Sequence, residues 1–109
     1  MPRRINGIVV FVTCASSAEA RRIATSLVES RLAACGNVCG APLRSIYRWK
    51  GKVEQAREVL LVLKSTRKAF VKMEREIRRL HSYSVPEIIA LPVVAGSRPY
   101  LEWLTESVE

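Results

Sequence analysis

Three short hydrophobic segments, the first of them rich in β-branched residues, constrain the fold of this chain more than any other feature. They cover Ile8–Thr13, Glu58–Lys64 and Glu87–Val93. Such segments favour β-strands. A strand that faces water on one side alternates apolar and polar residues, but these segments are apolar at nearly every position. The sequence therefore predicts a sheet with two hydrophobic faces.

Two amphipathic segments with helical periodicity lie between these strands. Ser16 and Glu19 have the spacing of a capping box at a helix start, and apolar residues then recur with a period near 3.6 as far as Leu32. We expect Gly36–Asn37 to end this first helix in a left-handed cap. The second helix is expected to follow a cap at Thr66 and to end before Pro86.

The remaining segments complete the order of elements. Residues 38–53 are expected to be extended, with a turn at Lys50–Lys52, and Tyr100–Leu104 begins a short terminal helix. Two interleaved βαβ halves give an α+β fold of the ferredoxin-like split βαβ type, β-α-β-β-α-β plus a C-terminal helix. In that fold the sheet is antiparallel and both helices lie on one face. The 109 residues contain no linker and are predicted to form one domain, residues 1–109.

A sheet of this kind leaves one hydrophobic face without a cover, because two helices can pack on only one side. Uncovered, that face exceeds the apolar patch of a typical monomer. The C-terminal helix and the arm at residues 38–52 are one candidate cover, and a second subunit is the other. We favour a second subunit because the C-terminal segment is too short to cover a whole sheet.

The composition excludes several classes of function. The net charge is +8, and all ten acidic residues are Glu, so Asp-dependent triads, EF-hand loops and Walker B carboxylates are absent. No nucleophile motif or glycine-rich phosphate loop appears, and we predict no catalytic activity. No apolar run approaches the roughly 18 residues that a membrane span needs. Three cysteines, an odd number, fit a reducing compartment, so we expect a cytoplasmic protein.

The charge also raises a nucleic-acid hypothesis. Tyr47 and Trp49 share one face of an extended segment, and Arg48 and Lys50 share the other. This pattern is typical of platforms that stack single-stranded bases, but it fits an interface anchor equally well. Nucleic-acid binding is disfavoured because the central strand at residues 59–64 has no aromatic residue.

Two sets of residues could bind a metal ion. Cys14, Cys35, Cys39 and His81 are ligand types for copper or zinc. However, Cys35 and Cys39 lack the C-x-x-C spacing of structural zinc sites, and both also fit as small core and strand residues. The segment from His81 to Glu87 combines an imidazole and a carboxylate that could bind a cation or exchange protons. Alternatively, His81 interacts with a helix dipole and Glu87 forms an intersubunit salt bridge.

Four motifs in the same chain point to one family. They are Leu32–Cys35, Ser45–Lys52, Val85–Val93 and Tyr100–Leu104. In this order and spacing they resemble the CutA family of divalent-cation tolerance proteins, from about Ile8 to Leu104.

The resemblance implies a cytoplasmic homotrimer built by pairing of strands between subunits, with copper or another divalent cation as a bound ion. Cys14 and His81 match the positions of copper ligands proposed in the family. Leu80 stands where some members have a second histidine, and Ser82 where proline is usual. The family's cluster near the intersubunit cleft maps here onto Tyr47, Trp49, Lys64, His81, Tyr83, Glu87 and Trp103. The resemblance also implies kinship with trimeric PII signalling proteins, and hence an alternative in which the cleft binds a small anionic metabolite.

Overall fold

The computed structural model describes residues 5–109 as five strands and three helices. In chain order these are β1 (Gly7–Cys14), α1 (Ser17–Glu29), β2 (Cys35–Val38), β3 (Leu43–Trp49), β4 (Lys52–Thr66), α2 (Phe70–Leu80), β5 (Ile88–Pro92) and α3 (Arg98–Ser107). Among these described residues, no helix is both long enough and apolar enough to cross a bilayer.

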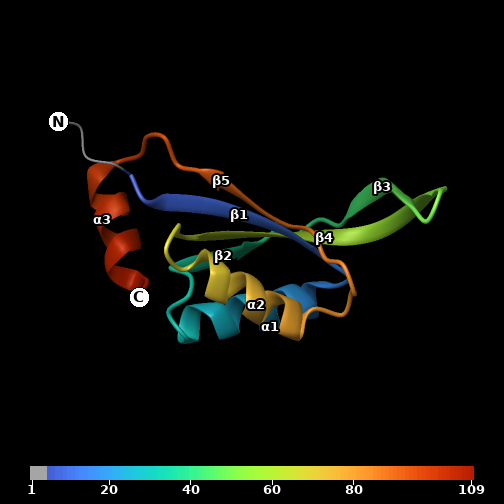
Figure 1. The fold of residues 1–109 in the computed structure, drawn as a ribbon, viewed down its shortest axis with the longest axis horizontal. Coiled ribbons are helices and arrows are strands. Elements are labelled where there is room, and N and C mark those ends of the chain that lie inside the picture. The colour runs from blue at the N-terminus through green and yellow to red at the C-terminus, as the bar shows by residue number, and fades with distance from the viewer. Residues whose placement is uncertain (1–4) are drawn as a thin grey trace.

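The strands form one antiparallel arrangement in the order β2-β4-β1-β5. The long strand β4 belongs to two parts of the molecule. Its second half lies between β1 and β2, and its first half pairs with β3 in a hairpin that extends away from the helices (Figure 1). The strand predicted at Glu58–Lys64 is therefore the second half of a strand that begins at Lys52. Residues 52–57 are largely polar, and the β3 ladder rather than burial makes them extended.

Helices α1 and α2 pack side by side on one face of the sheet (Figure 1). Between them and the sheet lies the main core, in which alternate residues of β1 and β4 meet the inner faces of both helices. Fully buried members are Val10, Val12, Ile23, Leu27, Leu61, Leu63, Met73 and Ile77. Burying each such side chain contributes about 1.5–3 kcal/mol, which makes this layer the main source of stability.

The opposite face of the sheet carries the intervening residues, and no helix within residues 5–109 packs across it (Figure 1). The register aligns Val9 with Leu91, and Phe11 with both Val62 and Ile89. Ile89 is 51% exposed and Leu91 47% exposed. We call Val9, Phe11, Leu60, Val62, Ile89 and Leu91 the open face. Its apolar character is what the missing alternation in the sequence predicts.

Helix α3 closes one end of the sheet instead of covering the open face (Figure 1). Its Leu104 is buried with Ala34, Ala69 and Val108 in a second small cluster. The terminal helix begins at Arg98, two residues before the predicted start at Tyr100. Ser97 at the N-cap and Pro99 in the first turn favour this earlier start.

The end of α1 differs from the prediction. The helix ends at Glu29 rather than at Gly36–Asn37, and Arg31 adopts the left-handed conformation with φ 61°. Gly36 instead lies in β2, where an added Cβ would come within 2.8 Å of the Ala24 Cβ. This glycine is required for close packing of a strand on α1, which a helix-cap pattern cannot reveal.

The two predicted helix starts have opposite outcomes. The Ser16 cap is confirmed, since its hydroxyl oxygen accepts a hydrogen bond from the Glu19 N–H at 3.1 Å. The Thr66 cap is wrong, because Thr66 is the last residue of β4 and α2 begins after Ala69 with no side-chain cap. The end of α2 at Leu80 also precedes Pro86 by several residues, which leaves a loop between α2 and β5.

Candidate functional site

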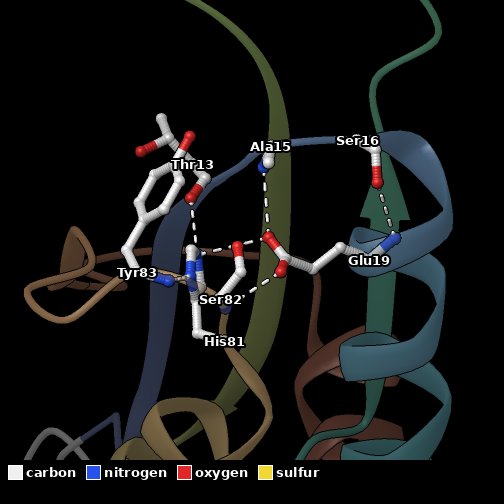
Figure 2. A network of polar contacts seen from close by, with 7 residues as sticks. All are labelled: Thr13, Ala15, Ser16, Glu19, His81, Ser82 and Tyr83. Carbon is white, nitrogen blue, oxygen red and sulfur yellow. Dashed lines mark hydrogen bonds and ion pairs between the residues drawn. The ribbon is translucent and has the colours of Figure 1, made fainter.

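The end of β1, the first turn of α1 and the end of α2 bring Cys14, Glu19 and His81 together. Their potential ligand atoms all lie within 4.8 Å of one another, and all three residues are buried. The two predicted metal ligands, Cys14 and His81, are thus neighbours. Glu19 joins them because the Ser16 cap fixes the first turn of α1 against the loop that follows α2 (Figure 2).

Hydrogen bonds to the backbone fix the orientation and tautomer of His81 (Figure 2). Its Nδ1 accepts the Tyr83 N–H at 3.1 Å, so Nδ1 carries no proton. Its Nε2 lies 2.8 Å from the Thr13 carbonyl oxygen and must be the N–H that donates to it. His81 is therefore neutral in this arrangement, and both ring nitrogens already have partners.

Glu19 joins three segments through its carboxylate (Figure 2). One oxygen accepts the Ala15 N–H at 3.1 Å, and the other accepts the Ser82 N–H at 2.9 Å. Burial alone raises the pKa of Glu19, but the hydrogen bonds from Ser82 and Ala15 outweigh it and hold the pKa below its usual value. Glu19 is thus a buried anion 3.8 Å from Nε2 of His81.

Cys14 is the least polar member of the cluster. Burial raises the pKa of its thiol to about 12, and the charges of Glu19 and Glu58 act in the same direction. The thiol is therefore protonated at neutral pH and unreactive as a nucleophile.

Sulfur, imidazole and carboxylate donors together fit a soft or borderline divalent cation. Binding at Cys14, Glu19 and His81 requires loss of the thiol proton and of the hydrogen bond from His81 to Thr13. The donor types fit copper or zinc, and the existing hydrogen bonds oppose binding.

The predicted cleft residues separate into two groups. Tyr47, Trp49, Tyr83 and Glu87 line one cavity of ≈ 790 Å³ at the base of the β3–β4 hairpin. Lys64 does not line it, and its ammonium donates to the Asn37 side chain instead. Trp103 lies on α3, where its ring is 5.4 Å from that of Tyr100.

Two acidic residues of this region are not identified as site residues by the sequence patterns. Glu19 fits a helix cap, and Glu58 fits the start of a strand. In the structure Glu58 is 6% exposed and lines the cavity. The one sequence signal for Glu58 is that a charged residue stands directly before an apolar strand. Its burial is seen only in the structure.

Tyr83 connects the cavity with the buried cluster. Its ring centroid is 4.7 Å from that of His81 (Figure 2). Burial, together with a hydrogen bond to the Glu58 carboxylate, raises the pKa of Tyr83 to about 12. Tyr83 therefore lies between the cavity and the buried cluster.

Comparison with known proteins identifies close relatives. Residues 8–107 match the model of a family described as CutA1 divalent ion tolerance protein. The divalent-cation tolerance protein CutA of Thermus thermophilus is 50% identical over 99 residues, which are 91% of this chain and 95% of that protein. The mouse protein CutA is 46% identical over 101 residues, 90% of this chain but 56% of the mouse protein. This chain thus spans just over half of the mouse relative.

A solved structure agrees with these matches. The structure of the divalent cation tolerance protein from Thermus thermophilus superimposes with a TM-score of 0.92 at 48% identity. The superposition covers 94% of this chain and 99% of the other.

Proposed function

The chain belongs to the CutA family of divalent-cation tolerance proteins, and from this membership we propose that it acts as a homotrimer that binds copper or another divalent cation. Each subunit is a ferredoxin-like domain in this proposal, and the protein works by binding rather than catalysis. A cytoplasmic location is part of the proposal and is supported by three free cysteines.

The open face is the observation that carries the proposed assembly. Phe11, Val62 and Ile89 lie next to one another across three strands, on the side of the sheet opposite α1 and α2. Covering apolar surface of this kind stabilises a protein by about 25 cal/mol for each Å² removed from water. The projecting β3–β4 hairpin and the free edge of β5 offer backbone groups through which a neighbouring copy can pair.

The proposed cation site consists of Cys14, Glu19 and His81. A bound divalent cation would supply the positive charge that favours the thiolate form of Cys14. Glu19 contributes an anionic oxygen that is already in place, and its two backbone hydrogen bonds keep it there. The hydrogen bond from His81 to Thr13 competes with the cation, so we expect weak binding.

Calorimetric titration with Zn²⁺ and Cu²⁺ tests this site. We expect binding to be lost in Cys14→Ser and in His81→Ala, and to be unchanged in the matched variant Cys39→Ser, which removes a cysteine outside the cluster. Equal affinity in wild type and Cys14→Ser would refute the site. Light scattering on the same samples tests the trimer separately.

The PII-like alternative is not favoured by the cavity beside the hairpin. The described residues that line the cavity include Glu58 and Glu87. They include no Lys or Arg. A small anionic metabolite would meet two carboxylates there and no positive charge.

A further inference from the structure

The cavity at the base of the hairpin is lined by aromatic and acidic side chains, which the fold alone does not require. The register places Tyr47 opposite Glu54 and Ser45 opposite Ala56, so these four side chains point to one side of the hairpin. Alternate positions carry Arg44, Arg48 and Arg57, which therefore point to the other side. The side of the hairpin toward the cavity thus carries Tyr47 and Glu54, with Trp49 and Lys52 near the turn, and the three arginines lie on the other side.

The charge of the cavity opposes that of the whole chain. The chain has 18 basic and ten acidic residues, yet the lining includes Glu58 and Glu87 and no described Lys or Arg. Glu58 is 6% exposed and has no ion-pair partner in the described part of the chain. A bound cation would give this buried acidic side chain the ion-pair partner that the described residues do not supply.

Three aromatic side chains complete the walls. Tyr47 and Trp49 are each 43% exposed, and Tyr83 faces Glu58. The Trp49 ring already attracts an ammonium group, since the Lys50 Nζ lies 5.9 Å from its centroid. Aromatic rings around a carboxylate recognise substituted ammonium ions through their π-faces.

We propose that this cavity binds a small organic cation, a substituted ammonium ion, with Glu58 as its counter-ion and Tyr47, Trp49 and Tyr83 as its aromatic walls. Val85 and Pro86 provide apolar contacts for its substituents. A hard metal ion would require several oxygen ligands in place of these rings and aliphatic groups. This site is separate from the proposed Cys14–Glu19–His81 metal site and does not depend on it.

Two probes of the same shape distinguish charge from hydrophobicity. Choline carries a quaternary nitrogen, and 3,3-dimethylbutan-1-ol has a neutral carbon in its place. In a Trp103→Phe background, Trp49 is the remaining tryptophan and reports binding by fluorescence. We expect choline to change this fluorescence saturably and the alcohol to bind at least roughly tenfold more weakly.

Variants test the assigned roles by calorimetry, which does not need the fluorophore. Glu58→Gln and Trp49→Leu are each expected to weaken choline binding roughly tenfold. The matched control Glu29→Gln makes the same charge change at an exposed position of α1 and should bind as wild type does. Far-UV circular dichroism and thermal unfolding of Glu58→Gln verify that the variant is folded, and Trp49→Leu tests the site without changing a buried charge.

Three outcomes would overturn the proposal: equal binding of choline and the alcohol, choline affinity unchanged in Glu58→Gln, or no choline binding up to about 10 mM. Cys14→Ser separates this proposal from the metal site. We expect it to lose Zn²⁺ binding and to retain choline binding.

Discussion

Cys14 illustrates how a single residue acquires its chemistry from its surroundings. The sequence presents it as one of three similar cysteines, but only Cys14 is fully buried beside two carboxylates. A buried neutral thiol behaves as a small hydrophobic group until a cation replaces its proton.

The raised pKa of Cys14 predicts low reactivity. In the variant Cys35→Ser/Cys39→Ser, the remaining thiol should react with a disulfide reagent at pH 8 far more slowly than a free thiol, whose pKa is near 8.5. The rate should rise to that of a free thiol when the protein is unfolded in guanidinium chloride. The matched variant Cys14→Ser/Cys39→Ser retains the half-buried Cys35 and should react faster in the folded state. Fast labelling of Cys14 in the folded protein would contradict its burial.

At the scale of elements, the contact between β2 and α1 depends on Gly36. An added methyl group would lie 2.8 Å from the Ala24 Cβ and 3.1 Å from a Leu63 methyl carbon. We expect Gly36→Ala to lower the free energy of unfolding by about 1–3 kcal/mol through overpacking. Gly40→Ala is the control, because its added Cβ would meet no described atom within 4 Å apart from those of its chain neighbours. Denaturant unfolding at one protein concentration measures both, and equal stability of the two variants would contradict this account.

A polar link between α1 and α2 gives the fold a dependence on pH. Glu76 accepts hydrogen bonds from Arg79 at 2.7 Å and from Ser26 of α1 at 2.9 Å, and these bonds lower the pKa of Glu76 to about 2. Because its folded pKa is depressed, its contribution is present above pH 4.5 and is lost as the pH falls toward 2. Glu76→Gln should therefore make the acid limb of stability less steep. Thermal unfolding between about pH 2 and pH 5 measures this, with Glu29→Gln as an exposed control.

The elements also show what local sequence patterns can and cannot specify. The Ser16 cap was predictable because all its atoms belong to one turn of chain. The end of α1 was not, since Gly36 is needed for contact with Ala24, and that contact exists only after β2 joins β4. The first half of β4 was missed for a similar reason, because its extended form depends on pairing with β3.

The candidate site shows the same limit. Cys14 and His81 were paired by family resemblance, and the structure places them together. Glu19 lies in the first turn of α1 and Glu58 lies in β4. Their roles depend on burial, and the burial of a charged residue cannot be predicted from the local sequence. The cavity therefore became recognisable only when the hairpin and the α2–β5 loop were placed side by side.

At the scale of the whole molecule, the open face and the hairpin cavity form one continuous surface. Thr13 lies opposite Leu60 at the end of the open face and also lines the cavity. A second copy that covers Phe11 and Val62 would therefore reach the rim of the cavity. We expect the proposed assembly and the proposed ligand binding to be coupled, because both proposed sites lie on the same side of the sheet.

Because of this coupling, the oligomeric state is the most informative property to measure. Phe11→Glu places a carboxylate at the centre of the open face, where Val62 and Ile89 flank it, and burying it there without a partner costs several kcal/mol. We expect wild type to sediment as a trimer and Phe11→Glu as a monomer at micromolar concentration. Val71→Glu is the control, since Val71 is 64% exposed on α2, away from the open face, and this variant should remain a trimer. A monodisperse wild-type monomer would show that the open face is stable in water, and a trimeric Phe11→Glu would place the subunit interface on another surface.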